Sequence, residues 1–301
     1  MITPLLGEQA FVRQFKTQKD RFNFSLKQIT IRNISPGSLA VGELLADSMF
    51  VRESSFRIYR DLTLPRDQEN RVGQYPHQLI MQVPFPLNIR TALLTNSYIE
   101  YKERNLKTKK NGRVRFHRVA ATISNVTNQP TSIRAGSMMT IDFTAWFLNM
   151  ARADVRMSLR LGDKQGRFSA SGRLAGFDAK NLNVITEPMG LARVERGTVK
   201  SLQFDMTGDN YRGDGELVML YDNLKISTLE QEDDGYKKKG LVSMIANMIV
   251  KNKNPSGGDT RTAKMSNERN TNRSFFNLVW KSIFTGVKES VGMDKIGKKN
   301  K

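Results

Sequence analysis

Apolar and polar residues alternate along much of the first 230 residues, in segments of roughly 8–14 positions that turn residues separate. Phe22, Phe24 and Leu26 fall on one side of such a segment, and the same spacing recurs further along the chain. A period of two is typical of strands with one buried and one solvated face. The pattern therefore predicts a chain that is mainly β.

The central part of the chain predicts consecutive hairpins. Alternating apolar positions run through residues 139–161, a glycine-containing turn follows at 162–166, and the alternation resumes at 168–174. A second hairpin turns over the glycine- and aspartate-rich residues 208–215. Consecutive hairpins form an antiparallel meander, and its apolar face must close on itself, pack on another layer or hold something apolar.

Three segments have helical spacing instead. Residues 178–190 predict a short helix that links two hairpins, and Pro188 limits its length. Apolar residues recur at helical spacing in 241–249 and again in 274–291, which predicts two amphipathic helices in the C-terminal part. Residues 259–269, between these helices, fit either a polar last strand or a loop.

Charge separates the C-terminal part from the rest. The formal net charge is +19, and residues 235–301 contain fifteen Lys and Arg against four Asp and Glu. We therefore divide the chain into a β region at residues 1–229 and a basic C-terminal module at residues 230–301, which carries the two helices and a flexible tail. An excess of positive charge favours polyanionic partners such as anionic lipid headgroups or nucleic acid.

The aromatic residues of the C-terminal module narrow this choice. They recur at helical spacing, which is more typical of packing than of base stacking, so no nucleic-acid partner is expected. A basic amphipathic helix is instead typical of a segment that covers the end of a sheet, or that contacts a membrane surface or a protein partner. For such a contact the predicted face comprises Lys237, Lys238, Lys239, Met244, Met248, Phe276, Trp280 and Phe284.

No catalytic or metal-binding constellation stands out in the sequence. The two histidines, His77 and His117, have no second ligand at metal-binding spacing. The absence of cysteine excludes thiolate ligands and thiol chemistry. Gly257 and Gly258 lack the lysine of a phosphate-binding loop, and no serine lies in a nucleophile-elbow pattern. We therefore expect a protein that is not an enzyme and that needs no cofactor or metal.

Three parts of the chain resemble the C-terminal half of AsmA-like cell-envelope proteins, of the Bacteroidota type within the AsmA and TamB superfamily. The resemblance rests on residues 56–61 with 98–103 and 112–116, on residues 197–202 with 207–211 and 215–225, and on residues 270–288. It implies a long, curved antiparallel sheet with an apolar concave groove. It also implies a periplasmic protein that is tethered to the inner membrane through an N-terminal helix absent from this chain, and that supports lipid transport and outer-membrane biogenesis.

The overall expectation is thus a groove-like antiparallel meander with a short linking helix and two C-terminal amphipathic helices. The groove would hold acyl chains of phospholipid or another envelope lipid, and an envelope assembly protein is a second expected kind of partner. The alternative is that the same apolar residues pack against one another as an ordinary sandwich core. The residues expected to line the groove are Met139, Ile141, Phe143, Phe147, Val155, Met157, Leu159, Phe168, Leu174, Phe204 and Met206.

Overall fold

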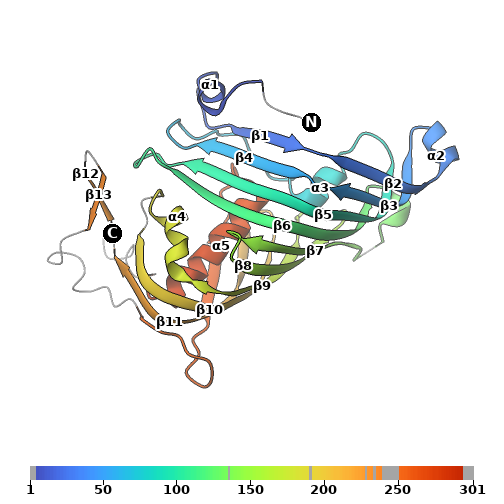
Figure 1. Ribbon diagram of the computed structural model, residues 1–301. Coiled ribbons are helices and arrows are strands. Elements are labelled where there is room, and N and C mark those ends of the chain that lie inside the picture. Colours follow the sequence, from blue (N-terminus) through green and yellow to red (C-terminus); the bar gives the residue numbers. More distant parts are fainter. Residues whose placement is uncertain are drawn as a thin grey trace.

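The alternating segments of the sequence form one long, curved, twelve-stranded sheet, which confirms the predicted mainly β fold (Figure 1). This computed structural model describes residues 5–134, 136–189, 192–227, 229–232, 235–238 and 251–293. The strands of the large sheet are β1 (Asp20–Ser25), β2 (Gln28–Ile34), β3 (Leu44–Arg52), β4 (Ser55–Asp61), β5 (Leu87–Arg104), β6 (Asn111–Thr127), β7 (Met138–Phe147), β8 (Ala151–Arg160), β9 (Phe168–Asp178), β10 (Arg193–Gly208), β11 (Arg212–Ser227) and β14 (Ala263–Glu268).

The strand order is β1-β4-β5-β6-β7-β8-β9-β10-β11-β14, with β2 paired to β3 and β3 paired to β5. From β5 to β14 all neighbours are antiparallel, as the hairpin pattern predicts. At the N-terminal end the fold departs from a meander, because β3 and β4 both run parallel to β5. Parallel neighbours need a crossover connection, and residues 62–86 provide it.

The described helices are short except for α5. They are α1 (Glu8–Val12), α2 (Pro36–Ala40), α3 (Pro76–Ile80), α4 (Asn183–Thr186) and α5 (Phe275–Ser290), and the 3-10 turns are η1 (Pro130–Ser132) and η2 (Ala179–Leu182). The predicted linking helix is confirmed as η2 followed by α4. The predicted helix at 274–291 is confirmed as α5, which begins where the Ser274 side chain accepts a hydrogen bond from the Asn277 amide.

Three further predictions concern the turn at 208–215, the segment 259–269 and the helix at 241–249. The turn predicted at 208–215 is shorter, since β10 ends at Gly208 and β11 begins at Arg212. Residues 263–268 of the uncertain segment 259–269 form β14, which settles that choice in favour of a strand. The helix predicted at 241–249 and the tail lie outside the described residues, and a small hairpin of β12 (Leu229–Glu232) and β13 (Gly235–Lys238) precedes that helix in the sequence.

Local irregularities bend the strands of the sheet. The pairing of β5 with β6 shifts register around Ser97, and the pairing of β6 with β7 shifts between His117 and Ala120. Asn96 and Arg118 adopt positive φ angles of 48° and 49° at these shifts. Bulges of this kind increase local twist and bend the strand that carries them. They are the local features that accompany the curvature of the sheet in Figure 1.

Helix α5 lies inside the curve of the sheet, across its concave face (Figure 1). Gly286 is the point of closest approach, since a Cβ atom there would lie 2.8 Å from Met265 Cγ on β14 and 2.9 Å from Leu217 Cβ on β11. Leu278 and Val279 join the buried core from the helix side. Part of the concave face is therefore the main hydrophobic core, and the C-terminal residues 263–290 belong to the same sheet and core as the residues before 228.

Candidate functional site

Strand register places the predicted groove-lining residues on one face of the sheet. Met139 pairs with Leu159, which pairs with Phe168, and the next same-face row joins Ile141, Met157 and Met206 through Ala170. Successive strand residues point to opposite faces, so residues in register share a face. The structure therefore brings together all eleven predicted residues on the concave face: Met139, Ile141, Phe143, Phe147, Val155, Met157, Leu159, Phe168, Leu174, Phe204 and Met206.

These eleven residues have two different environments. The buried ones are Met139, Phe147, Leu159, Phe168, Phe204 and Met206. Five stay partly exposed, namely Ile141, Phe143, Val155, Met157 and Leu174. Phe168 shows how the covered part is closed, because its ring lies 5.9 Å from that of Tyr75 and 4.8 Å from that of Phe275. One part of the predicted groove is thus filled by the protein itself. In the other part Ile141, Val155, Met157 and Leu174 pack against the core and keep part of their surface exposed, as does Phe143.

A row of phenylalanine rings extends this surface towards β1. The ring centroids of Phe22 and Phe24 are 5.6 Å apart, and that of Phe56 follows at 5.5 Å from Phe24. Phe116 bridges the central strands, with its ring 5.8 Å from those of both Phe143 and Phe147. We call the partly exposed apolar face from β1 to β8 the trough.

The trough includes residues that sequence reasoning did not nominate. Phe56 and Phe116 were not among the expected lining residues, and Phe22 was noted only for its place in an alternating segment. The alternation of apolar and polar residues with a period of two in β1, β4 and β6 could have identified these residues from the sequence. Phe22 is 46 % exposed, so this end of the trough is open.

Helix α5 presents a second apolar strip that does not face the core. Phe276 and Trp280 are 61 % and 43 % exposed, and Phe284 is half-buried. Their spacing of four residues puts them along one line of the helix. Phe276 and Trp280 are thus exposed, and their role in a contact with a membrane or a partner stays a prediction. Lys237 and Lys238 fall on β13, whose side chains are not described, and Lys239, Met244 and Met248 lie outside the described residues.

The covered end of the concave face is fastened by a buried arginine. The Arg269 guanidinium donates hydrogen bonds to the carbonyl oxygens of Asn210 (3.1 Å), Arg71 (2.7 Å) and Arg273 (3.2 Å). It also lies 4.4 Å from the centre of the Tyr75 ring. Burial raises the pKa of Tyr75 to about 12 and lowers the pKa of Arg269. These groups hold the crossover segment to the sheet and to the start of α5, which is a structural role.

His77 is the most isolated polar group of this region. Its side chain is fully buried beside Tyr75, and neither ring nitrogen has a hydrogen-bond partner within the described part of the chain. Burial lowers the pKa of His77 to about 4, and the negative charge of Asp163 opposes this shift. A neutral imidazole enclosed in this way has no access to a substrate, so it does not suggest catalysis.

The opposite, outer face of the sheet carries a polar pocket beside α1. Its carboxylates are engaged in ion pairs, at 2.6 Å between Glu8 and Lys102 and at 3.0 Å between Glu100 and Arg115. The Tyr98 hydroxyl also donates to Glu100 at 2.9 Å, while burial raises the pKa of Tyr98 to about 12. Because each acidic group already has a cationic partner, the pocket offers no poised acid or base.

The described residues contain neither a metal-binding cluster nor a membrane-spanning helix. No cluster of three or more His, Asp or Glu side chains in the described ranges is arranged to hold a metal ion. None of the described helices has the length and apolar character needed to span a membrane. Comparison of this chain with known proteins gives no matching family model, no matching curated protein and no matching solved structure.

Proposed function

We propose that this chain is a non-catalytic module that holds lipid acyl chains along the trough. The observation that carries the proposal is the apolar face from Phe22 through Phe116 to Val155, whose residues strand register and ring contacts place side by side and which stays partly exposed. Contiguous exposed apolar patches on a soluble surface mark binding sites for apolar partners. A lipid is a suitable occupant because each buried methylene contributes about 0.8 kcal/mol.

The polar outer face of the sheet also supports the proposal. Ion pairs cover this face, including Arg156 with Asp142 at 2.6 Å and Arg212 with Asp214 at 2.6 Å. Such exposed pairs add little stability, but they keep the outer face hydrated. The asymmetry between the faces is consistent with an acyl chain held inside the curve. The resemblance to AsmA-like proteins extends the proposal to lipid transport and outer-membrane biogenesis in the cell envelope.

Polar substitutions in the uncovered part of the trough are expected to remove bound lipid. Phe143 and Val155 are cross-strand partners on the concave face and are only partly buried, so Phe143→Asn with Val155→Asn should leave the sheet intact. The matched control is Thr140→Asn with Ser158→Asn, which changes a cross-strand pair on the outer face of the same strands. The measurement is native mass spectrometry of detergent-free protein, with extraction and quantification of co-purified phospholipid.

We expect lipid at a fixed stoichiometry in the wild type and in the control, and a large loss in the trough variant. Circular dichroism verifies that each variant keeps its strand content. Lipid retained by the folded trough variant would contradict the proposal. A wild-type protein that carries no lipid, and takes none up from vesicles, would contradict it as well and favour a closed-core reading.

A second candidate function rests on the exposed strip of α5. We propose, as the alternative, that Phe276 and Trp280 insert into a membrane surface or a protein partner, with Lys281 and Lys288 of the same helix near anionic headgroups. Exposed aromatic side chains on a basic helix suit such an interface. In Phe276→Ser with Trp280→Ser, vesicle sedimentation should then fall about tenfold or more, since two aromatic anchors are lost. Equal sedimentation of this variant and the wild type would remove the alternative.

A further inference from the structure

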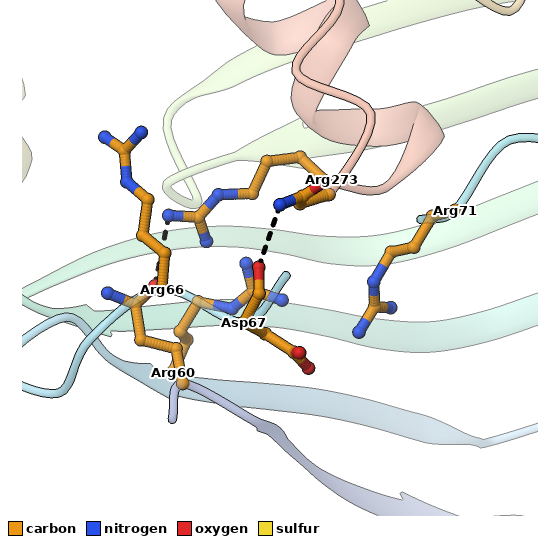
Figure 2. A pocket seen from close by; sticks show the side chains of 7 residues that line it. Arg60, Arg66, Asp67, Arg71 and Arg273 are labelled. Carbon is orange, nitrogen blue, oxygen red and sulfur yellow. Dashed lines mark hydrogen bonds between the residues drawn. The ribbon is translucent and has the colours of Figure 1, made fainter. Parts of the chain in front are cut away.

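Arginine side chains from distant parts of the chain meet at the end of the trough. Figure 2 shows Arg60, Arg66, Arg71 and Arg273 arranged around Asp67. Arg60 ends the row of inward-facing residues on β4, and Arg273 lies just before Ser274, the residue that caps α5. We call these four arginines the arginine cluster. No single stretch of the sequence predicts this cluster, because its members are separated by up to 213 positions in the chain.

Hydrogen bonds fix the geometry of the cluster. Arg60 binds Asp20 through two parallel contacts, at 2.6 Å from Nε to Oδ1 and 2.5 Å from Nη2 to Oδ2. Arg273 donates to the side-chain oxygen of the buried Gln18 at 3.1 Å. The side-chain amide of Asn272 donates a hydrogen bond to the backbone carbonyl oxygen of Asp67 at 3.1 Å. This bond connects the segment before α5 to the crossover segment. Arg60 and Arg273 are therefore held in place before any ligand arrives.

The cluster carries more positive charge than its carboxylates neutralise. Asp20 pairs with Arg60, Asp67 pairs with Lys19, and Glu69 lies 3.7 Å from both Lys19 and Arg71. Among the described residues, neither Arg66 nor Arg273 forms an ion pair with a carboxylate. Glu103 lies opposite Arg60 on the neighbouring strand and acts on both Arg60 and Arg273. Five cations thus face four anions, and one positive charge remains in excess.

The local electrostatics agree with this count. Burial and the neighbouring guanidinium of Arg60 lower the pKa of Arg273, and Arg66 acts in the same direction. Glu103 opposes the shift but makes no ion pair with Arg273, and its carboxylate accepts a hydrogen bond from Tyr101 at 2.7 Å. Because the positive charges repel one another and are not fully balanced by the neighbouring carboxylates, an added anion would stabilise the cluster.

We propose that the arginine cluster binds the phosphate group of an anionic lipid whose acyl chains lie in the trough. This inference rests on the proposed acyl-chain function and adds the chemical class of the headgroup. Guanidinium groups suit phosphate because their planar donors form paired, charge-assisted hydrogen bonds with its oxygens. The ligand required is an amphiphile with a phosphate at one end.

The positions of the cluster and the trough fit one amphiphile. Asp20 and Arg60 are cross-strand partners, and the next same-face pair along these strands is Phe22 with Ile58. An anion at the cluster is thus followed directly by apolar side chains. On the other side, the exposed ring of Phe276 lies only three residues beyond Arg273. The charged and apolar surfaces are continuous at this end of the trough.

The volume of the cavity within the arginine cluster determines where the phosphate binds. The cavity enclosed by these side chains measures about 10 Å³, which is room for about one water molecule. A phosphate therefore binds at the open side, where Arg66 is exposed and can turn towards it, with Arg273 as the second contact. Arg60 and Arg71 keep their carboxylate partners and supply the surrounding positive field.

The test compares two lipids with identical acyl chains, phosphatidylglycerol and diacylglycerol, each titrated onto the full chain and counted by native mass spectrometry. The variant is Arg66→Gln with Arg273→Gln. The control is Arg173→Gln with Arg134→Gln, which removes two positive charges from exposed positions away from the cluster. Inorganic phosphate, titrated calorimetrically, separates a lipid headgroup from a free anion.

We expect the wild type and the control to bind phosphatidylglycerol about tenfold or more tightly than diacylglycerol, because charged hydrogen bonds are gained. The cluster variant should lose this preference and still bind diacylglycerol. Equal binding of both lipids by the wild type, or an unchanged preference in the cluster variant, would overturn the headgroup site and leave the acyl-chain function standing. Phosphate binding without any lipid binding would overturn the lipid assignment together with the proposed function.

Discussion

Replacing Arg269 with methionine is expected to lower the free energy of unfolding by about 3 kcal/mol, the largest loss we predict for a single side chain outside the trough. Arg269 is 7 % exposed, and its guanidinium holds three carbonyl oxygens that belong to different segments. Each buried carbonyl left without its donor costs about 1–3 kcal/mol. The lost cation–π contact with Tyr75 adds roughly 1–2 kcal/mol.

Two effects reduce this sum. Burial of Arg269 without a carboxylate is itself unfavourable, as its lowered pKa indicates, and methionine removes that cost. Methionine also keeps much of the apolar stem. Urea denaturation followed by circular dichroism measures the free energy of unfolding of the wild type and of Arg269→Met. Arg173→Met is the matched control at an exposed position. A loss below about 1 kcal/mol would show that the three hydrogen bonds do not fasten the crossover segment.

Acidification is expected to destabilise the fold through His77. Its pKa is about 4 in the folded protein, mainly because burial disfavours the imidazolium, whereas an unfolded histidine titrates near 6.5. The unfolded chain therefore takes up this proton at a higher pH than the folded chain does. The contribution of His77 to stability is complete above about pH 6.5 and is lost as the pH falls towards 4. The difference amounts to about 3 kcal/mol.

The measurement is the free energy of unfolding between pH 7.5 and 4.5, in the wild type and in His77→Leu. The variant has no ionisable group at this position, so its stability should change much less over this range. His117→Leu is the matched control, because His117 is partly exposed and should account for only a small part of the loss. A flat pH profile in the wild type would contradict the prediction.

Short-range periodicity predicted the larger part of the sheet and its apolar face. The alternation through Met139, Leu159 and Phe168 correctly put these residues on one face, because the side-chain period of a strand is fixed at two. The same reasoning gave α5, where apolar residues at helical spacing follow a serine that caps the helix. These features depend on residues that are near one another in the chain.

The parallel pairing of β3 and β4 with β5 could not be predicted from such short-range patterns. Strands that pair across a crossover carry no turn signal between them, and antiparallel neighbours are the more frequent arrangement. The contacts of Tyr75 and Phe275 with Phe168 could not be predicted either, since 93 and 107 positions, respectively, separate these residues from Phe168. Periodicity shows that a face is apolar, but it does not show what lies on it.

By itself, the sequence determined that this protein is a β-rich chain with one apolar and one charged sheet face, a basic C-terminal part and an amphipathic last helix. Only the tertiary structure decided which section of the apolar face is core and which is open trough, and it alone gathered Arg60, Arg66 and Arg273 at one end. The physical reason is that side-chain periodicity is set by local backbone geometry, whereas burial and charge clustering depend on contacts between segments far apart in the chain.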